Sequence, residues 1–223
     1  MHTERSGALL NQLQSLLAGI YDVPIAYDVA EFLLTDRKRL PLSHGANAGD
    51  EQVLVASEAD ALEIGVFLEP AVLERLTQAN PLDALHGGNL ADYWTALEGV
   101  SHFIYLAFNA IHDRPVSLLE LELQAEIDKY VSTLWLLRAQ DPARFPAEVH
   151  NALFVRAHVD VTLAGARIGL YRQANAYAER FCRHLSATLR SRATSDRALA
   201  VAELRRFYRL SEERKVRHID RTS

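Results

Sequence analysis

The chain has 223 residues, of which 49% are hydrophobic and 24% are charged. This composition is typical of a globular protein with a buried core and excludes a disordered or fibrous chain. Ten glycines and seven prolines are few for the tight turns of an all-β protein, so they favour long helices. A single cysteine, Cys182, excludes an internal disulfide framework and any zinc or iron–sulfur site built from cysteines.

Charge is distributed unevenly along the chain, whose formal net charge at pH 7 is −5. Residues 180–223 contain 12 Lys and Arg against 5 Asp and Glu, whereas residues 1–179 contain 12 against 24. The basic end either docks on the acidic body of the chain or binds an anionic partner, and the acidic body would repel nucleic acid. We therefore expect self-docking. The alternative is that the basic C-terminal helix, which carries Arg205, Arg206 and Arg209, contacts nucleic acid or a membrane surface, and nucleic acid could bind only there.

The N-terminus and the most apolar stretch bear on the compartment. Residues 1–6 include charged side chains and no apolar segment of a secretory signal. The most apolar stretch, residues 93–111, is interrupted by Glu98, His102 and Asn109. Because a membrane span needs about 20 mostly apolar residues, this stretch predicts a buried core helix. We expect a cytoplasmic protein without a membrane span.

The N-terminal part of the chain predicts a helix followed by a small β element. Leucines at helical spacing predict a helix over residues 6–18, and residues 28–31 resemble a capping box that opens a short helix. Residues 52–56 and 62–68 are rich in β-branched and apolar side chains and are separated by a polar connection of hairpin length. We expect an antiparallel hairpin there, joined by a third strand near Leu40.

The remainder of the chain predicts helices. Pro70 suits the first turn of a helix, and Ser117 with Glu120 forms a capping box. The predicted helices cover residues 70–78, 89–111, 117–138, 141–158, 163–190 and 194–210, and the residues beyond Glu213 are expected to be frayed.

Together these elements predict a mostly α fold, a helical bundle of five to six helices with a small N-terminal antiparallel β-hairpin. We expect residues 1–69 to form an α+β segment packed on the bundle, residues 70–213 to form the bundle, and residues 214–223 to be a frayed basic tail. The helices over 89–111 and 117–138 are joined by a short turn, so they are expected to be antiparallel neighbours.

The helix over residues 89–111 is apolar almost all round, which is typical of a central element. Within it, Glu98, His102, Tyr105 and Asn109 recur at the spacing of a single polar stripe. Polar groups inside a core must be hydrogen-bonded, paired with a charge or bound to a ligand. This stripe is therefore the strongest chemical feature of the sequence.

Two carboxylates on the following helix, Glu122 and Glu126, are possible partners of Glu98 and His102. Carboxylates and histidines on facing helices form the metal sites of helical bundles, so these four residues are the predicted ligands of a divalent transition metal. The match is incomplete, because such sites use Glu-x-x-His on two helices and this chain has one Glu98-x-x-x-His102. The alternative, which is the more common one, is a buried hydrogen-bonded Glu–His pair that fixes helix register.

Two functions from different classes remain open. The sequence contains no G-x-S-x-G elbow, no Walker A motif and no G-x-G-x-x-G loop. We therefore expect an intracellular, non-catalytic interaction or regulatory protein that binds a protein partner or self-associates. The alternative is a metal-dependent enzyme with a carboxylate/histidine site inside the helical bundle. Cys182 lies on an apolar helical stripe and is expected to be an inert core thiol.

Overall fold

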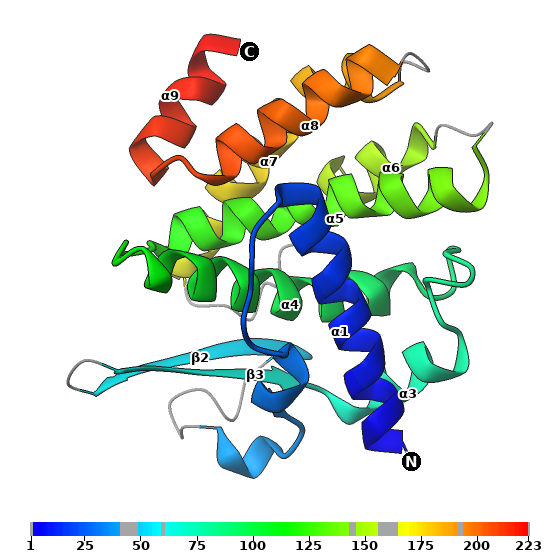
Figure 1. Cartoon of the computed structure of the whole chain (residues 1–223), viewed down its shortest axis with the longest axis vertical. Helices are drawn as coiled ribbons and strands as arrows, with labels where there is room; N and C mark the ends of the chain where they lie inside the picture. The colour runs from blue at the N-terminus through cyan, green and yellow to red at the C-terminus, as the bar shows by residue number, and fades with distance from the viewer. Residues whose placement is uncertain are drawn as a thin grey trace. The chain divides into compact units, whose positions relative to one another are not determined.

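A computed structural model describes residues 2–40, 49–58, 61–142, 146–155, 165–190 and 194–222. Within these ranges it contains eight α-helices and a three-stranded sheet (Figure 1). The predicted mostly α fold with a small N-terminal β part is confirmed, although the helices outnumber the five to six expected. No helix among the described residues is both long and apolar enough to cross a membrane.

The chain divides into two compact units, Met1–Leu16 with Pro24–Arg114, and Leu17–Val23 with Pro115–Ser223. This division differs from the predicted boundaries at residues 69 and 213. The first unit continues to Arg114, and the N-terminal helix contributes residues to both units. The first unit contains the N-terminal part of α1 (His2–Tyr21), followed by η1 (Val29–Phe32), β1 (Leu33–Leu34), η2 (Arg37–Arg39), β2 (Glu51–Glu58), β3 (Ala61–Leu68), α3 (Pro70–Gln78) and α4 (Leu90–Ile111).

The sheet of the first unit has the strand order β1-β3-β2. Strands β2 and β3 form the predicted antiparallel hairpin, with Glu51 opposite Leu68. The third strand of the sheet, β1, lies earlier in the chain than the expected position near Leu40 and pairs in parallel with β3. Residues 41–48 lie outside the described part of the chain. The residues after β1 turn into η2, where the Asp36 side chain accepts a hydrogen bond from the Lys38 N–H at 3.0 Å. This local turn ends the extended conformation before Leu40 is reached.

Helix α4 lies against α3 and the hairpin within the first unit. Pro70 begins α3, as predicted. Asn89 directly precedes α4, and its side chain does not cap the helix but ties the preceding connector together. Its amide donates to the carbonyls of Ala79 and Ala84 at 3.0 and 2.9 Å, and its oxygen accepts from the His86 N–H at 2.9 Å. The buried face of α4 includes Tyr93, Leu97, Val100, Phe103 and Ile104.

The second unit contains α5 (Leu118–Gln140), α6 (Glu148–His150), the π-helical turn η3 (Asn151–Val155), α7 (Gly165–Arg190), α8 (Thr194–Tyr208) and α9 (Glu212–Thr222). The predicted capping box at the start of α5 is confirmed, since Ser117 Oγ accepts from the Glu120 N–H at 3.0 Å. Phe181 of α7 stacks on Phe207 of α8 with ring centroids 3.9 Å apart, so aromatic packing holds these two helices together.

The expectation of a frayed tail beyond Glu213 is wrong. Residues Glu212–Thr222 form α9, and the side chains of Lys215 and Ile219 are fully buried. Ile219 supplies apolar burial, and the Lys215 amine finds an acceptor in Gln124 Oε1 at 2.6 Å. A buried lysine with such a partner anchors a helix that is otherwise highly charged.

Candidate metal centre

The polar stripe of α4 is buried along most of its length. His102, Tyr105 and Asn109 are 2%, 0% and 1% exposed, and Glu98 is half-buried. The stripe separates into two halves with different partners, both from the first unit. The half nearer the C-terminus of α4 contains Tyr105 and Asn109, and the other half contains Glu98 and His102.

Arg114 holds the C-terminal half of the stripe. Its Nε donates to Asn109 Oδ1 at 2.5 Å, and its guanidinium also donates to the Tyr105 hydroxyl at 2.9 Å. The Asn109 amide in turn donates to the Tyr105 carbonyl at 2.7 Å. These contacts give the buried polar groups of Tyr105 and Asn109 hydrogen-bond partners at the end of the helix, which accounts for this half of the stripe without a ligand. Sequence reasoning missed Arg114, although its place in the turn directly after the helix was a usable signal.

Glu51 contacts the other half of the stripe. Its Oε1 lies 3.3 Å from His102 Nδ1, and the side chains of His102 and Glu51 are 3% and 11% exposed. Glu98 precedes His102 by one helical turn, and the ligand atoms of these two residues lie within 4.8 Å of each other. One imidazole and two carboxylates therefore gather at one place in the first unit.

Two backbone features bring Glu51 to the helix. It is the first residue of β2 and is held in register opposite Leu68. Gly99 lies in α4 between Glu98 and His102, and a Cβ there would be 2.8 Å from Val66 Cγ1 and 3.3 Å from Glu51 Cγ. The absence of a side chain at residue 99 thus lets the hairpin approach the helix closely.

The contact with Glu51 determines which nitrogen of His102 can bind a ligand. A carboxylate accepts hydrogen bonds, so its partner Nδ1 carries a proton, and a neutral imidazole then has its lone pair on Nε2. Histidines that bind metals commonly donate their other N–H to a carboxylate in this way. The same geometry also suits a structural Glu51–His102 ion pair. A measurement of metal binding distinguishes a metal ligand from a structural pair.

The two other predicted ligands, Glu122 and Glu126, lie on α5 in the second unit. Glu122 is 5% exposed. Glu126 Oε1 accepts a hydrogen bond from Lys129 Nζ at 2.9 Å, one turn away. Since α4 and α5 belong to different units, the participation of these carboxylates in one site with His102 stays a prediction.

Arg205 of α8 and Arg209, in the turn directly after α8, bind carbonyl groups at the end of α1, within the second unit. Arg205 donates to the carbonyls of Ile20 and Gly19 at 3.0 and 3.2 Å. Arg209 donates to the carbonyls of Tyr21 and Asp22 at 3.0 and 2.8 Å. Cations at the C-terminus of a helix satisfy carbonyls that have no partner within the helix and complement its dipole.

Arg206, the third predicted binding residue, has a different neighbour, His218 Nδ1 at 3.4 Å. The prediction that Arg205, Arg206 and Arg209 bind an anionic partner stays open, but the first and last of them already make contacts within the chain.

A chain of buried polar groups that sequence reasoning missed crosses the second unit. The Tyr21 hydroxyl and the Gln124 amide both donate to Asp128 Oδ1, at 2.5 and 2.7 Å, and Lys215 donates to Gln124. Burial, with a further contribution from the Asp128 carboxylate, raises the pKa of Tyr21 well above its ordinary value.

Cys182 is fully buried, and burial raises the pKa of its thiol well above the ordinary value too. The thiol is therefore protonated and enclosed, as expected for an inert core cysteine.

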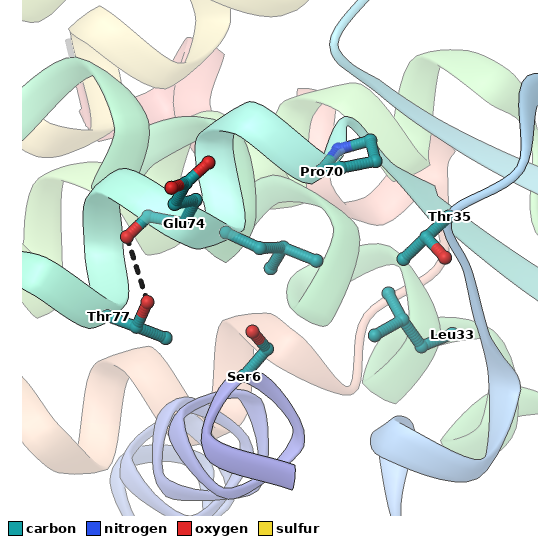
Figure 2. Close-up of a pocket in the computed structure, with 7 residues that line it drawn as sticks. Ser6, Leu33, Thr35, Pro70, Glu74 and Thr77 are labelled. Carbon is teal, nitrogen blue, oxygen red and sulfur yellow. Dashed lines mark hydrogen bonds between the residues drawn. The ribbon is translucent and has the colours of Figure 1, made fainter. Parts of the chain in front are cut away.

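A cavity of about 290 Å³ lies elsewhere in the first unit (Figure 2). Thr77 and Thr35 lie on opposite sides of it, and the Thr77 hydroxyl donates to the Glu74 carbonyl at 2.8 Å. Its lining contains none of the predicted ligands and comprises Ser6, Leu33, Thr35, Pro70, Leu73, Glu74 and Thr77. We assign no ligand to this cavity.

Comparisons with protein-family models, curated protein sequences and solved structures find no match to the chain.

Proposed function

We propose that the protein binds a divalent transition metal ion through His102 Nε2 and the carboxylate of Glu98. The observation that carries the proposal is the 3.3 Å contact between His102 Nδ1 and Glu51 Oε1 at an almost fully buried imidazole. A carboxylate at that position orients the ring and raises the basicity of the opposite nitrogen. In this proposal Glu51 positions the histidine and does not itself bind the ion.

The ligand types favour particular ions. Imidazole suits zinc and iron, carboxylates suit manganese, and a mixed set accommodates any of the three. Two ligands from the first unit leave coordination positions open, and an open position is what a catalytic metal site offers to water or substrate. Of the two functions that the sequence leaves open, we therefore propose the second, a metal-dependent enzyme. Glu122 and Glu126 stay predicted additional ligands, and substitutions of each belong in the test.

The test is a calorimetric titration of the full chain, freed of any affinity tag and stripped of metal, with MnCl₂ and with ZnCl₂. We expect Glu98→Gln and His102→Asn each to weaken one binding event by about tenfold or more, and Glu51→Gln to weaken it by about tenfold through loss of orientation. Weakening by Glu122→Gln or Glu126→Gln would assign that residue to the site as well.

His112→Asn is the matched control, because His112 lies at the end of the same helix and its Nδ1 contacts the Phe108 carbonyl at 2.7 Å. This variant should bind metal like the wild type. An apo protein that takes up no ion, or an affinity that His102→Asn leaves unchanged, would refute the proposal. The Glu51–His102 contact would then be a structural pair, and removing both partners should cost less stability than removing one.

A further inference from the structure

Three polar side chains from three different helices converge in the second unit. They are His184 on α7, Glu203 on α8 and His218 on α9. Oε1 of Glu203 lies 3.5 Å from His184 Nε2 and 3.1 Å from His218 Nε2. The side chains are 38%, 24% and 15% exposed, in the order His184, Glu203, His218. Two imidazoles therefore direct the same ring nitrogen to one carboxylate oxygen at the protein surface.

We propose that these three side chains bind one Zn²⁺ ion, with both Nε2 atoms and a carboxylate oxygen of Glu203 as ligands. Ligand atoms about 2 Å from a tetrahedral ion lie roughly 3.3 Å from each other, and both nitrogen–oxygen distances already match this spacing. The two nitrogens lie farther apart than the ligands of one ion. Binding therefore requires the His184 side chain, which is 38% exposed, to turn toward Glu203 and His218. Water takes the fourth position, because the site is open to solvent.

Aromatic packing fixes the orientation of His218. Its ring lies at 64° to both Phe181 and Phe207, with centroid distances of 6.0 and 5.7 Å. These two phenylalanines stack on each other and are fully buried. A ring held against such a rigid pair loses little further freedom when Nε2 binds an ion, which favours binding.

Arg206 opposes metal binding at the same ring. Its guanidinium lies 3.4 Å from His218 Nδ1. An N–H donor there favours a lone pair on Nδ1 and hence the proton on Nε2, which is the atom that an ion needs. The positive charge also repels a cation. Loss of the Arg206 charge should therefore increase the affinity for zinc.

The site is independent of the one proposed on α4, because all three ligands belong to the second unit. The sequence does not reveal this site, because its three ligands lie on separate helices and do not recur at a regular spacing. An ion there would link α9 to α7 and α8, and an ion that binds only the folded chain raises the melting temperature by mass action.

The experiment uses the full, tag-free chain carrying His102→Asn, so that the site on α4 is removed. After chelation, this chain is titrated with ZnCl₂ by calorimetry, and its melting temperature is measured with and without zinc. We expect one ion per chain and a higher melting temperature in zinc. His218→Asn and His184→Asn should each weaken binding by about tenfold or more. Arg206→Gln should tighten it by roughly two- to fivefold, the range of an exposed charge interaction, and His112→Asn should have no effect.

Circular dichroism verifies that each variant is folded. If His218→Asn fails to fold, the comparison rests on His184→Asn, whose side chain is the most exposed of the three. The proposal is overturned if the His102→Asn chain binds no zinc, or if its affinity is the same with and without the histidine substitutions. Either result leaves the site on α4 untouched, because that site is assayed in chains that retain His102.

Discussion

Gly99 leaves room for the side chain of Glu51, because a Cβ at residue 99 would lie 3.3 Å from Cγ and 3.4 Å from Oε1 of that glutamate. The same Cβ would lie 2.8 Å from Cγ1 of Val66 on β3. A glycine inside a helix is less favourable than alanine by about 1 kcal/mol, so its benefit here is the close approach of the hairpin to α4. This approach places a strand carboxylate at the imidazole of His102.

Gly99→Ala should lower the free energy of unfolding by about 1–3 kcal/mol, because overpacking outweighs the gain in helix propensity. It should also weaken metal binding, since the hairpin that carries Glu51 has to move. Urea unfolding and metal titration measure the two effects. Gly169→Ala on α7 is the control, because nothing lies within 4 Å of a Cβ there, and it should stabilise the protein by about 0.5–1 kcal/mol. Equal stability of Gly99→Ala and wild type would contradict the close packing.

Tyr21→Phe should lower the free energy of unfolding by about 1–3 kcal/mol at neutral pH, because it removes a donor from the buried Asp128 carboxylate. The substitution should also change how the free energy of unfolding depends on pH. The pKa of Tyr21 is raised in the folded state, from an ordinary value of 10.0, so its contribution is complete below pH 10 and decreases as the pH rises above that value toward the folded pKa. Unfolding between pH 8 and 11 should therefore show a steeper alkaline loss in wild type than in Tyr21→Phe. Tyr27→Phe, at a 52% exposed side chain, should follow wild type; identical slopes in all three would disprove the assignment.

Arg209→Ala should lower the free energy of unfolding by about 1 kcal/mol, because the guanidinium caps two carbonyls at the end of α1. Arg206→Ala removes the same charge from the last turn of α8, where the Arg206 guanidinium contacts His218 instead of the carbonyls of α1, so this variant should change stability by less. Thermal and urea unfolding of both variants make the comparison. Equal stability of the two variants, together with equal loss of affinity for an anionic partner, would favour the alternative that these arginines bind that partner.

Cys182 should resist alkylation in the native protein. Burial raises its pKa above the ordinary value of 9.0, and the nearby carboxylates add to the effect. Iodoacetamide should therefore label the thiol only after unfolding, as mass spectrometry would show. Labelling at the same rate with and without urea would show that the thiol is accessible in the folded chain.

Local signals in the sequence predicted much of the fold. Three local signals determine structure within a few residues, so they could be read directly. They are the capping box at Ser117, the proline at the start of α3, and the two apolar, β-branched runs of the hairpin with their short polar connection. The third strand was placed too late in the chain and α9 was missed. Pairing with β3 decides the first and burial of Lys215 the second, and neither is a local property.

The candidate site was only half predictable for the same reason. Helical periodicity alone placed Glu98 and His102 on one stripe, because residues four apart share a face. Glu51 approaches that stripe from a strand 51 residues away from His102 in the sequence. No periodicity connects residues on different elements, so a partner of this kind emerges only from the tertiary packing.

The metal content of the purified protein distinguishes a metal centre at His102 from a structural Glu51–His102 pair. The measurement is inductively coupled plasma mass spectrometry on tag-free wild type and on His102→Asn, prepared side by side without added metal or chelator. If His102 binds an ion, wild type contains near-stoichiometric manganese, iron or zinc, and His102→Asn has lost close to one ion per chain. Equal metal content in the two proteins, or none in wild type, would contradict a metal centre at His102 and leave Glu51 and His102 as a structural pair.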